Sequence, residues 1–172
     1  MNTLELAKHK EHLLQEIGEA TTQPYDWTQT HNGEETKRYS FTTDADLNYT
    51  VGIRLLYYEV DANEPDYASV EFSVIKKGED GDYYSDYYVS TNKGELYRVM
   101  STVVDILKDL LNKNKSLRYI EFEADKEGKD NSQRANLYST YVKKQLPNAE
   151  IERQQRAGFE KVVIKIDKEE EE

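Results

Sequence analysis

The chain has 172 residues, of which 33% are charged, and it carries a formal net charge of −11 with no cysteine. This length predicts one domain with a substantial core, and the missing cysteines exclude disulfides, thiolate nucleophiles and Cys-ligated zinc. Nucleic acids and anionic membranes attract positive surfaces, so the negative charge argues against both as partners. No apolar run reaches the roughly 20 residues that a membrane-spanning helix needs, and we expect a soluble protein.

The first half of the chain is predicted to form one helix followed by antiparallel strands. Residues 3–19 place leucine and isoleucine at helical spacing up to Gly18. The stretch 20–35 is rich in turn formers and predicts a loop. Alternating strand patterns separated by short turns follow, which predicts a meander; in 47–60 apolar residues occupy both faces, so both are expected to be partly covered. The predicted strands cover residues 36–43, 47–60, 67–77 and 83–91.

The second half alternates helices and strands. An apolar stripe with helical spacing predicts a helix over 94–113, and residues 130–146 predict another that ends before Pro147. Strands are predicted over 117–124 and 158–166. We therefore predict an α+β fold in which an N-terminal helix and a meander precede helix, strand, helix and strand on a mixed sheet. Residues 1–167 are predicted to form one domain and 168–172 an acidic disordered tail.

This order of elements resembles the GNAT (Gcn5-related N-acetyltransferase-like) fold over about residues 36–167. Several residues stand in an order similar to that family's pattern N-x-x-A-x-x-L-Y followed by G-F: Asn131 or Ser132, Ala135, Leu137, Tyr138, Gly158 and Phe159. The resemblance implies an acyl-CoA-dependent acetyltransferase in which Tyr138 protonates the departing thiolate of coenzyme A.

The cofactor loop of that family follows the pattern Q/R-x-x-G-x-G/A, whose backbone N–H groups hold the pyrophosphate at a helix N-terminus. The corresponding stretch here, TNKGELYRVM, has one glycine, Gly94, and places the acidic Glu95 where a phosphate needs positive potential. We therefore predict no bound cofactor. If acetyl-CoA or another anionic ligand binds, Gly94, Arg98 and Arg134 are the predicted contacts.

A second, looser resemblance is to small proteins of tailed bacteriophages. The motifs that carry it are G-E-x-Y-R-V, T-V-V-D, I-x-F-x-A and S-x-R-x-x-L-Y, which begin here at Gly94, Thr102, Ile120 and Ser132. It implies a phage accessory or virion protein with a degenerate acetyltransferase-like fold, located in the cytoplasm of an infected bacterium or in the virion. It brings no particular activity.

The chain contains 14 tyrosines, several of them as adjacent pairs in predicted strands. Adjacent residues of a strand face opposite sides, so one of each pair should meet solvent or a partner. Tyrosine is enriched in protein interfaces. We therefore predict a non-enzymatic protein–protein interaction module that binds a virion or host protein. The predicted contact residues are Trp27, Tyr57, Tyr58, Tyr83, Tyr84, Tyr87 and Tyr88.

Two other functions remain open. One is a divergent acyl-CoA-dependent N-acetyltransferase that uses the Gly94 loop and Tyr138. The other is a small phage anti-defence protein that binds a host factor or a nucleotide-type ligand through Arg98 and Arg134. We predict no metal site: His9, His12 and Glu16 could share a helix face, but zinc would need further ligands.

Overall fold

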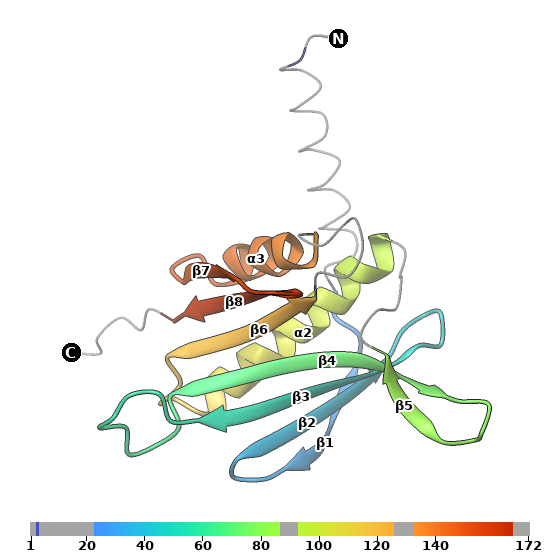
Figure 1. The fold of residues 1–172 in the computed structure, drawn as a ribbon, viewed down its shortest axis with the longest axis horizontal. Helices are drawn as coiled ribbons and strands as arrows, with labels where there is room; N and C mark the ends of the chain where they lie inside the picture. Colours follow the sequence, from blue (N-terminus) through green and yellow to red (C-terminus); the bar gives the residue numbers. More distant parts are fainter. Residues whose placement is uncertain (1–2, 4–22, 87–92, 126–132, 167–172) are drawn as a thin grey trace.

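The computed structural model describes residues 23–86, 93–125 and 133–166, together with Thr3. These residues form one mixed eight-stranded sheet and two helices (Figure 1). The helices are α2 (Lys93–Lys113) and α3 (Gln133–Gln145). The strands are β1 (Trp27–Asn32), β2 (Thr36–Thr42), β3 (Asn48–Leu56), β4 (Tyr67–Lys77), β5 (Tyr83–Asp86), β6 (Tyr119–Asp125), β7 (Glu150–Gln155) and β8 (Phe159–Lys165). The α+β class and the mixed sheet are as the sequence predicts.

The sheet has the strand order β1-β2-β3-β4-β6-β8-β7, and β5 pairs with β4 outside this path. Strands β1 to β4 form an antiparallel meander. Strand β6 lies parallel to β4, and β8 and β7 continue antiparallel. Strand β6 thus pairs with β4 and not with β5, the strand that directly precedes α2.

Both helices lie on one face of the sheet, where the core is. Alternate residues of β3, from Tyr49 to Leu55, are buried on this face, as the period-two pattern predicts. The stripe of α2 is equally regular, and Val99, Val103, Ile106 and Leu110 have no exposed surface. In the described part of the chain, no helix is long and apolar enough to cross a membrane.

The chain turns away from the sheet at Leu56, four residues earlier than predicted. Both carboxylate oxygens of the buried Asp66 accept backbone N–H groups of the β3–β4 loop, from Tyr58 at 2.6 Å and from Glu59 at 3.0 Å. These bonds replace the strand ladder and fold the loop back. As a result the apolar side chains after Leu55 are exposed, and the predicted partial cover of this second face is wrong.

Two edge strands were missed because their side chains are mostly polar. Strand β1, WTQTHN, lies within the predicted loop 20–35, and β7, EIERQQ, within a stretch assigned to no element. Each pairs with one neighbour only, and polar edges of this kind discourage further pairing. Gly33, Glu34 and Glu35 connect β1 to β2, and Gly33 N–H donates to the Thr36 carbonyl at 2.9 Å. The predicted first helix, apart from Thr3, and the predicted tail lie outside the described residues.

A buried ion pair fixes the C-terminal strands to α3. Glu160 on β8 has no exposed surface, and its two oxygens accept Nε and Nη2 of Arg153 on β7 at 2.6 and 2.9 Å. The remaining Nη1 of Arg153 donates to Asn136 on α3 at 2.6 Å. A bidentate guanidinium of this kind is the geometry in which a buried carboxylate is well compensated.

Replacing Arg153 with methionine should lower the free energy of unfolding by about 3 kcal/mol, because Glu160 would stay buried with its bidentate partner removed. Urea denaturation followed by far-UV circular dichroism measures this change. The double variant Arg153→Met/Glu160→Leu should recover much of the loss, since it removes the buried charge as well. An Arg153→Met protein as stable as the wild type would contradict this account.

Candidate functional site

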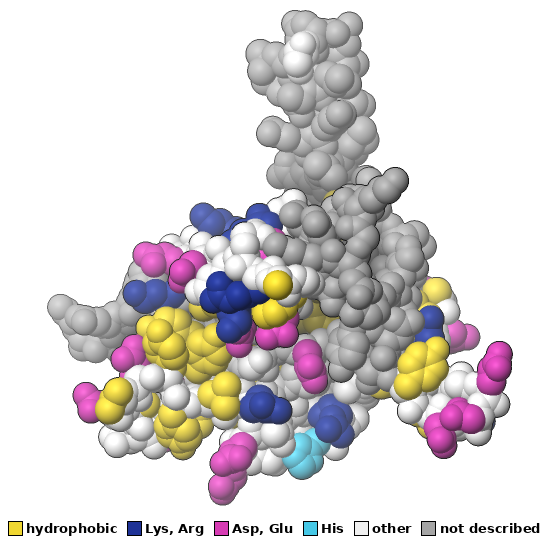
Figure 2. Space-filling model, viewed as in Figure 1, with side chains coloured by type: hydrophobic (Ala, Val, Ile, Leu, Met, Phe, Trp, Pro, Cys, Tyr) yellow, Lys and Arg dark blue, Asp and Glu magenta, His cyan; other side chains and the backbone are white. Residues whose placement is uncertain are grey.

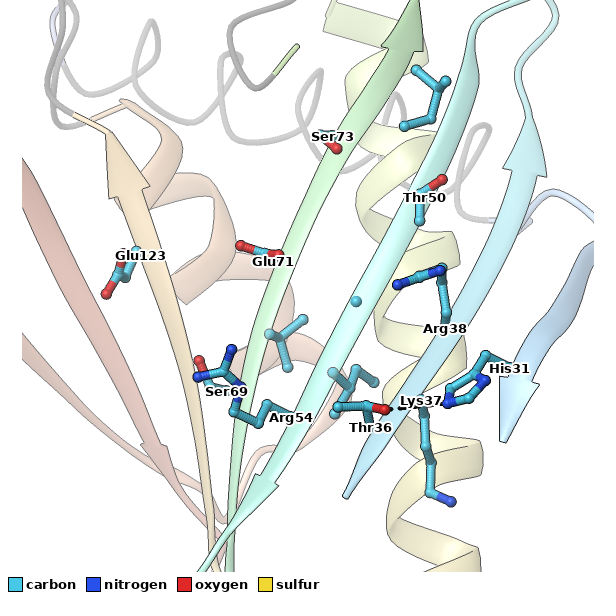
Figure 3. Close-up of a pocket in the computed structure, with 14 residues that line it drawn as sticks. His31, Thr36, Lys37, Arg38, Thr50, Arg54, Ser69, Glu71, Ser73 and Glu123 are labelled. Atoms are coloured by element: carbon cyan, nitrogen blue, oxygen red, sulfur yellow. Dashed lines mark hydrogen bonds between the residues drawn. The ribbon is translucent and has the colours of Figure 1, made fainter. Parts of the chain in front are cut away.

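The face of the sheet opposite the helices carries a hollow. No described element covers this face, and α2 runs behind the sheet in the view of Figure 1. The hollow has a volume of about 620 Å³ and lies over β2, β3 and β4 (Figure 3). Its lining comprises His31, Thr36, Lys37, Arg38, Thr50, Gly52, Ile53, Arg54, Ser69, Val70, Glu71, Ser73, Ile75 and Glu123. This volume lies within the range of ordinary ligand sites.

Small residues form the floor of the hollow. Gly52 on β3 pairs with Arg38 on β2 and with Glu71 on β4, so one row of the sheet reads arginine, glycine, glutamate. A Cβ atom on Gly52 would lie 3.6 Å from Cγ of Glu71. In the adjoining rows Thr50 pairs with Ser73. The missing side chain of Gly52 therefore opens the hollow at its centre.

The walls of the hollow carry opposite charges. Arg38 and Arg54 stand on β2 and β3, whereas Glu71 and Glu123 stand on β4 and β6 (Figure 3). Within the described residues none of these four side chains makes a hydrogen bond or an ion pair. The basic groups beside them form hydrogen bonds with nearby residues. Lys37 Nζ donates to Asn32 Oδ1 at 2.6 Å, and His31 Nε2 lies 3.2 Å from Thr36 Oγ1.

An aromatic patch adjoins the hollow on the same face. We use this name for Leu56, Tyr57, Tyr58, Val60, Tyr67 and Tyr119. The rings of Tyr58, Tyr67 and Tyr119 touch one another, with centroids 5.1–6.0 Å apart. Tyr57 is 60% exposed, Tyr58 64% and Val60 fully exposed. Apolar side chains gather toward this end of the face in Figure 2. Large side chains left in water at this density are typical of a contact surface.

Carboxylates surround the aromatic patch. The Tyr119 hydroxyl donates to Glu59 Oε1 at 3.3 Å, and the nearly buried Glu121 pairs with Lys161. Burial raises the pKa of Tyr67 well above its ordinary value, and Glu121 raises it further. Burial followed by Glu59 raises the pKa of Tyr119. Both phenols therefore stay neutral in an acidic setting, where they can act as hydrogen-bond donors.

The tyrosines predicted to form one interface lie at two ends of the sheet. Tyr57 and Tyr58 belong to the β3–β4 loop, at the left of Figure 1, and Tyr83 and Tyr84 to the β4–β5 hairpin at its right. Strand β4 separates them with 11 residues, which span roughly 35 Å. Tyr87 and Tyr88 lie outside the described residues. The two described pairs therefore cannot form one small contact surface.

Trp27 is half-buried and bonded inside the protein. Its indole Nε1 donates to Asp105 Oδ2 on α2 at 2.9 Å, and its ring packs edge-on against Tyr39 at 5.4 Å. The polar tip of this side chain thus fastens the edge strand β1 to the helix. Sequence reasoning placed Trp27 at an interface because it lay in a stretch predicted to be a loop.

Arg98 joins three parts of the chain. Its Nε donates to the Gln23 carbonyl at 3.0 Å and its Nη1 to Asp44 Oδ2 at 3.1 Å. Its guanidinium lies 3.9 Å from the ring centroid of Tyr25. Asp44 belongs to the β2–β3 turn, so Arg98 of α2 already has a carboxylate partner within the fold. Gly94 and Arg134 lie in the first turns of α2 and α3, and their side-chain surroundings are not described.

Tyr138 fills the point where β4 and β6 separate. Parallel pairing ends at Val70 and Phe122, and the nearly buried ring of Tyr138 on α3 then contacts Phe72 at 5.4 Å and Phe122 at 5.3 Å. These three aromatic side chains close the widening gap from the helix side. Packing therefore accounts for the position of Tyr138 in the described structure.

No protein-family model, no curated protein and no solved structure matches the chain. The fold and the site therefore define a class in physical terms only: an α+β domain with a one-sided core whose bare sheet face carries a charged hollow and an aromatic patch. The hollow was missed by sequence reasoning. Gly52, in the interior of an otherwise regular strand pattern, was the signal that could have indicated it.

Replacing Arg98 with methionine should lower the free energy of unfolding by about 2 kcal/mol, because a hydrogen bond, a partly exposed ion pair and a cation–π contact are lost together. Guanidinium denaturation measures the change. If Arg98 instead served an anionic ligand and not the fold, its removal would leave stability unchanged.

The stability of the fold should fall as pH rises above about 10, because the folded state holds Tyr67 and Tyr119 neutral while the unfolded chain ionises them. Their contribution is fully present below the unfolded pKa and is lost as pH rises toward the higher folded pKa. Urea midpoints at pH 8 and pH 11 measure the loss. The variant Tyr67→Phe/Tyr119→Phe should lose less stability over this interval, and an equal loss would contradict the assignment.

Proposed function

We propose that the protein is a non-enzymatic protein–protein interaction module that binds its partner through the aromatic patch. The observation that carries this proposal is the exposure of Tyr57, Tyr58 and Val60 beside a triangle of mutually packed tyrosines. Tyrosine supplies contact area and a hydrogen-bonding tip at low entropic cost. The packed rings of Tyr67 and Tyr119 hold Tyr58 in place before a partner arrives, which reduces the cost of ordering it.

The acidic surroundings of the patch favour a partner with basic side chains. The β3–β4 loop reads YYEVDANEPD and carries four acidic residues and no basic one. Glu59, Asp61 and Glu64 are exposed. Arginine side chains stack on tyrosine rings and pair with carboxylates, so arginine suits both features of this loop.

We propose the phage virion or the infected host cell as the setting, on the strength of the resemblance to proteins of tailed bacteriophages. We also propose that the sheet is a degenerate GNAT-like one. The support for this is the antiparallel meander followed by a parallel strand after α2 and a closing pair in which β8 lies inside β7.

A divergent acetyltransferase is the second candidate, and the same strand order favours it. Two observations weigh against it. The nearly buried ring of Tyr138 is packed between Phe72 and Phe122, and Arg98 is already bonded to Asp44. The bonded state of Arg98 also weakens the proposal of a nucleotide-type ligand held by Arg98 and Arg134.

The triple variant Tyr57→Ser/Tyr58→Ser/Val60→Ser should lose partner binding, because it removes the exposed apolar surface and leaves the core intact. The matched control is Tyr83→Ser/Tyr84→Ser, which removes two exposed tyrosines at the other end of β4. A partner is first isolated with the wild type from tailed-phage particles and infected-cell extract. Its affinity for each purified variant is then measured by calorimetry, and we expect at least a roughly tenfold loss for the triple variant alone.

Equal affinity of the triple variant and the wild type would overturn the assignment of the patch. Titration with acetyl-CoA provides the test between the two candidate functions. Saturable binding that weakens in Tyr138→Phe would favour the acetyltransferase over the interaction module.

A further inference from the structure

We infer that the hollow on the bare sheet face binds an extended peptide segment with an acidic residue at one end and a basic residue four positions away. This inference rests on the proposed role in protein binding and names the chemistry of the bound segment. It uses residues that lie outside the aromatic patch. Three features of the hollow support it: the glycine at its centre, the opposite charges of its walls and the distance between those walls.

Gly52 occupies a position whose backbone conformation is open to any residue. Strand β3 pairs with both neighbours in unbroken register through this residue, and Gly52 is not among the residues with a positive φ. Glycine in a strand interior weakens the strand and often marks the close approach of another chain or a ligand. What glycine provides here is open space between Arg38 and Glu71.

Two arginines form an anion-binding wall. Arg38 and Arg54 stand on neighbouring strands of the same face, two residues apart in register, because Arg38 pairs with Gly52. Figure 3 shows their guanidinium groups on opposite sides of β3, with Arg54 directed toward Ser69. Diagonal neighbours of this kind lie about 7 Å apart at their Cβ atoms, so both side chains are long enough to turn toward one carboxylate. Neither has a hydrogen-bond or ion-pair partner in the described residues.

Glu71 and Glu123 form the opposite wall. Register places Arg38, Gly52 and Glu71 in one row, and Glu123 lines the hollow from β6, just beyond the end of its pairing with β4 (Figure 3). From β2 to β4 there are two strand spacings, or about 10 Å, and β6 stands farther away because its pairing with β4 ends at Val70 and Phe122. In an extended peptide, side chains four residues apart face the same side at about 13 Å. A segment that crosses the strands would therefore place its acidic residue at the arginines, small residues over Gly52 and its basic residue at the glutamates.

Other occupants fit the charges less well. A nucleic acid or a polyphosphate would place phosphates against Glu71 and Glu123, and the chain as a whole carries a charge of −11. A basic segment alone would meet Arg38 and Arg54. The hollow also continues toward the aromatic patch, since the row of Arg54 and Ser69 adjoins the row of Leu56 and Tyr67. One protein partner can thus occupy both.

The test uses the ¹⁵N-labelled full chain and a capped five-residue peptide with glutamate first, lysine last and small residues between. Saturable shifts should appear at the amides of Gly52, Thr50 and Ser69. The same peptide with glutamine at both ends should bind at least about tenfold more weakly, because both charge pairs are lost. A peptide with glutamate at both ends that binds as well would reduce the hollow to a general anion site and overturn the inference.

Two variants complete the experiment. Gly52→Val fills the hollow with a residue that strands favour and should abolish the shifts, whereas Ser40→Val, on the same face outside the lining, should not. The double variant Arg38→Glu/Arg54→Glu should reject the original peptide and bind one with lysine at both ends. Thermal unfolding of each variant confirms that it is folded.

Undisturbed amides around Gly52 at millimolar peptide, or equal binding by Gly52→Val, would overturn the inference. Either result leaves the proposed interaction module standing if the triple variant of the aromatic patch still loses its partner. Conversely, peptide binding at the hollow with no effect of the patch variant on partner binding would overturn the role of the patch and keep that of the hollow.

Discussion

The parallel pairing of β4 with β6 joins the two halves of the protein, and it comprises only four residue pairs, from Tyr67–Tyr119 to Val70–Phe122. Asp66 fixes this register at its start. Its carbonyl accepts the N–H groups of Arg118 and Tyr119 at 2.8 and 3.0 Å, while its carboxylate folds the β3–β4 loop. One buried residue thereby sets both the sheet seam and the loop that presents the aromatic patch.

Beyond the four pairs the strands part, and the consequences differ on the two faces. On the helix side Phe72, Phe122 and Tyr138 fill the gap with aromatic rings. On the bare side Glu71 and Glu123 stand at the edge of the hollow. Because both helices pack on one face, the polar and charged side chains of the other face find no hydrogen-bond or ion-pair partners in the core. A surface of this kind is suited to recognition, and its residues contribute little to folding.

Several side chains that looked functional in the sequence hold the fold together. Arg98 bridges Gln23, Asp44 and Tyr25, and Trp27 reaches Asp105 on α2. Each of these contacts joins residues more than 50 positions apart along the chain. No local pattern predicts such partners, because the distances that matter are set by how β1 and the β2–β3 turn meet the helix.

The sequence by itself determined the α+β class, the inward face of β3 and the stripe of α2, because burial on one side imposes a period that can be read along the chain. It did not determine β1 and β7, since edge strands bury little and their polar residues resemble loops. Only the tertiary structure decided that the tyrosines separate to two ends of β4. It also decided that Arg38, Gly52 and Glu71 share one row, because cross-strand register depends on pairing between distant segments.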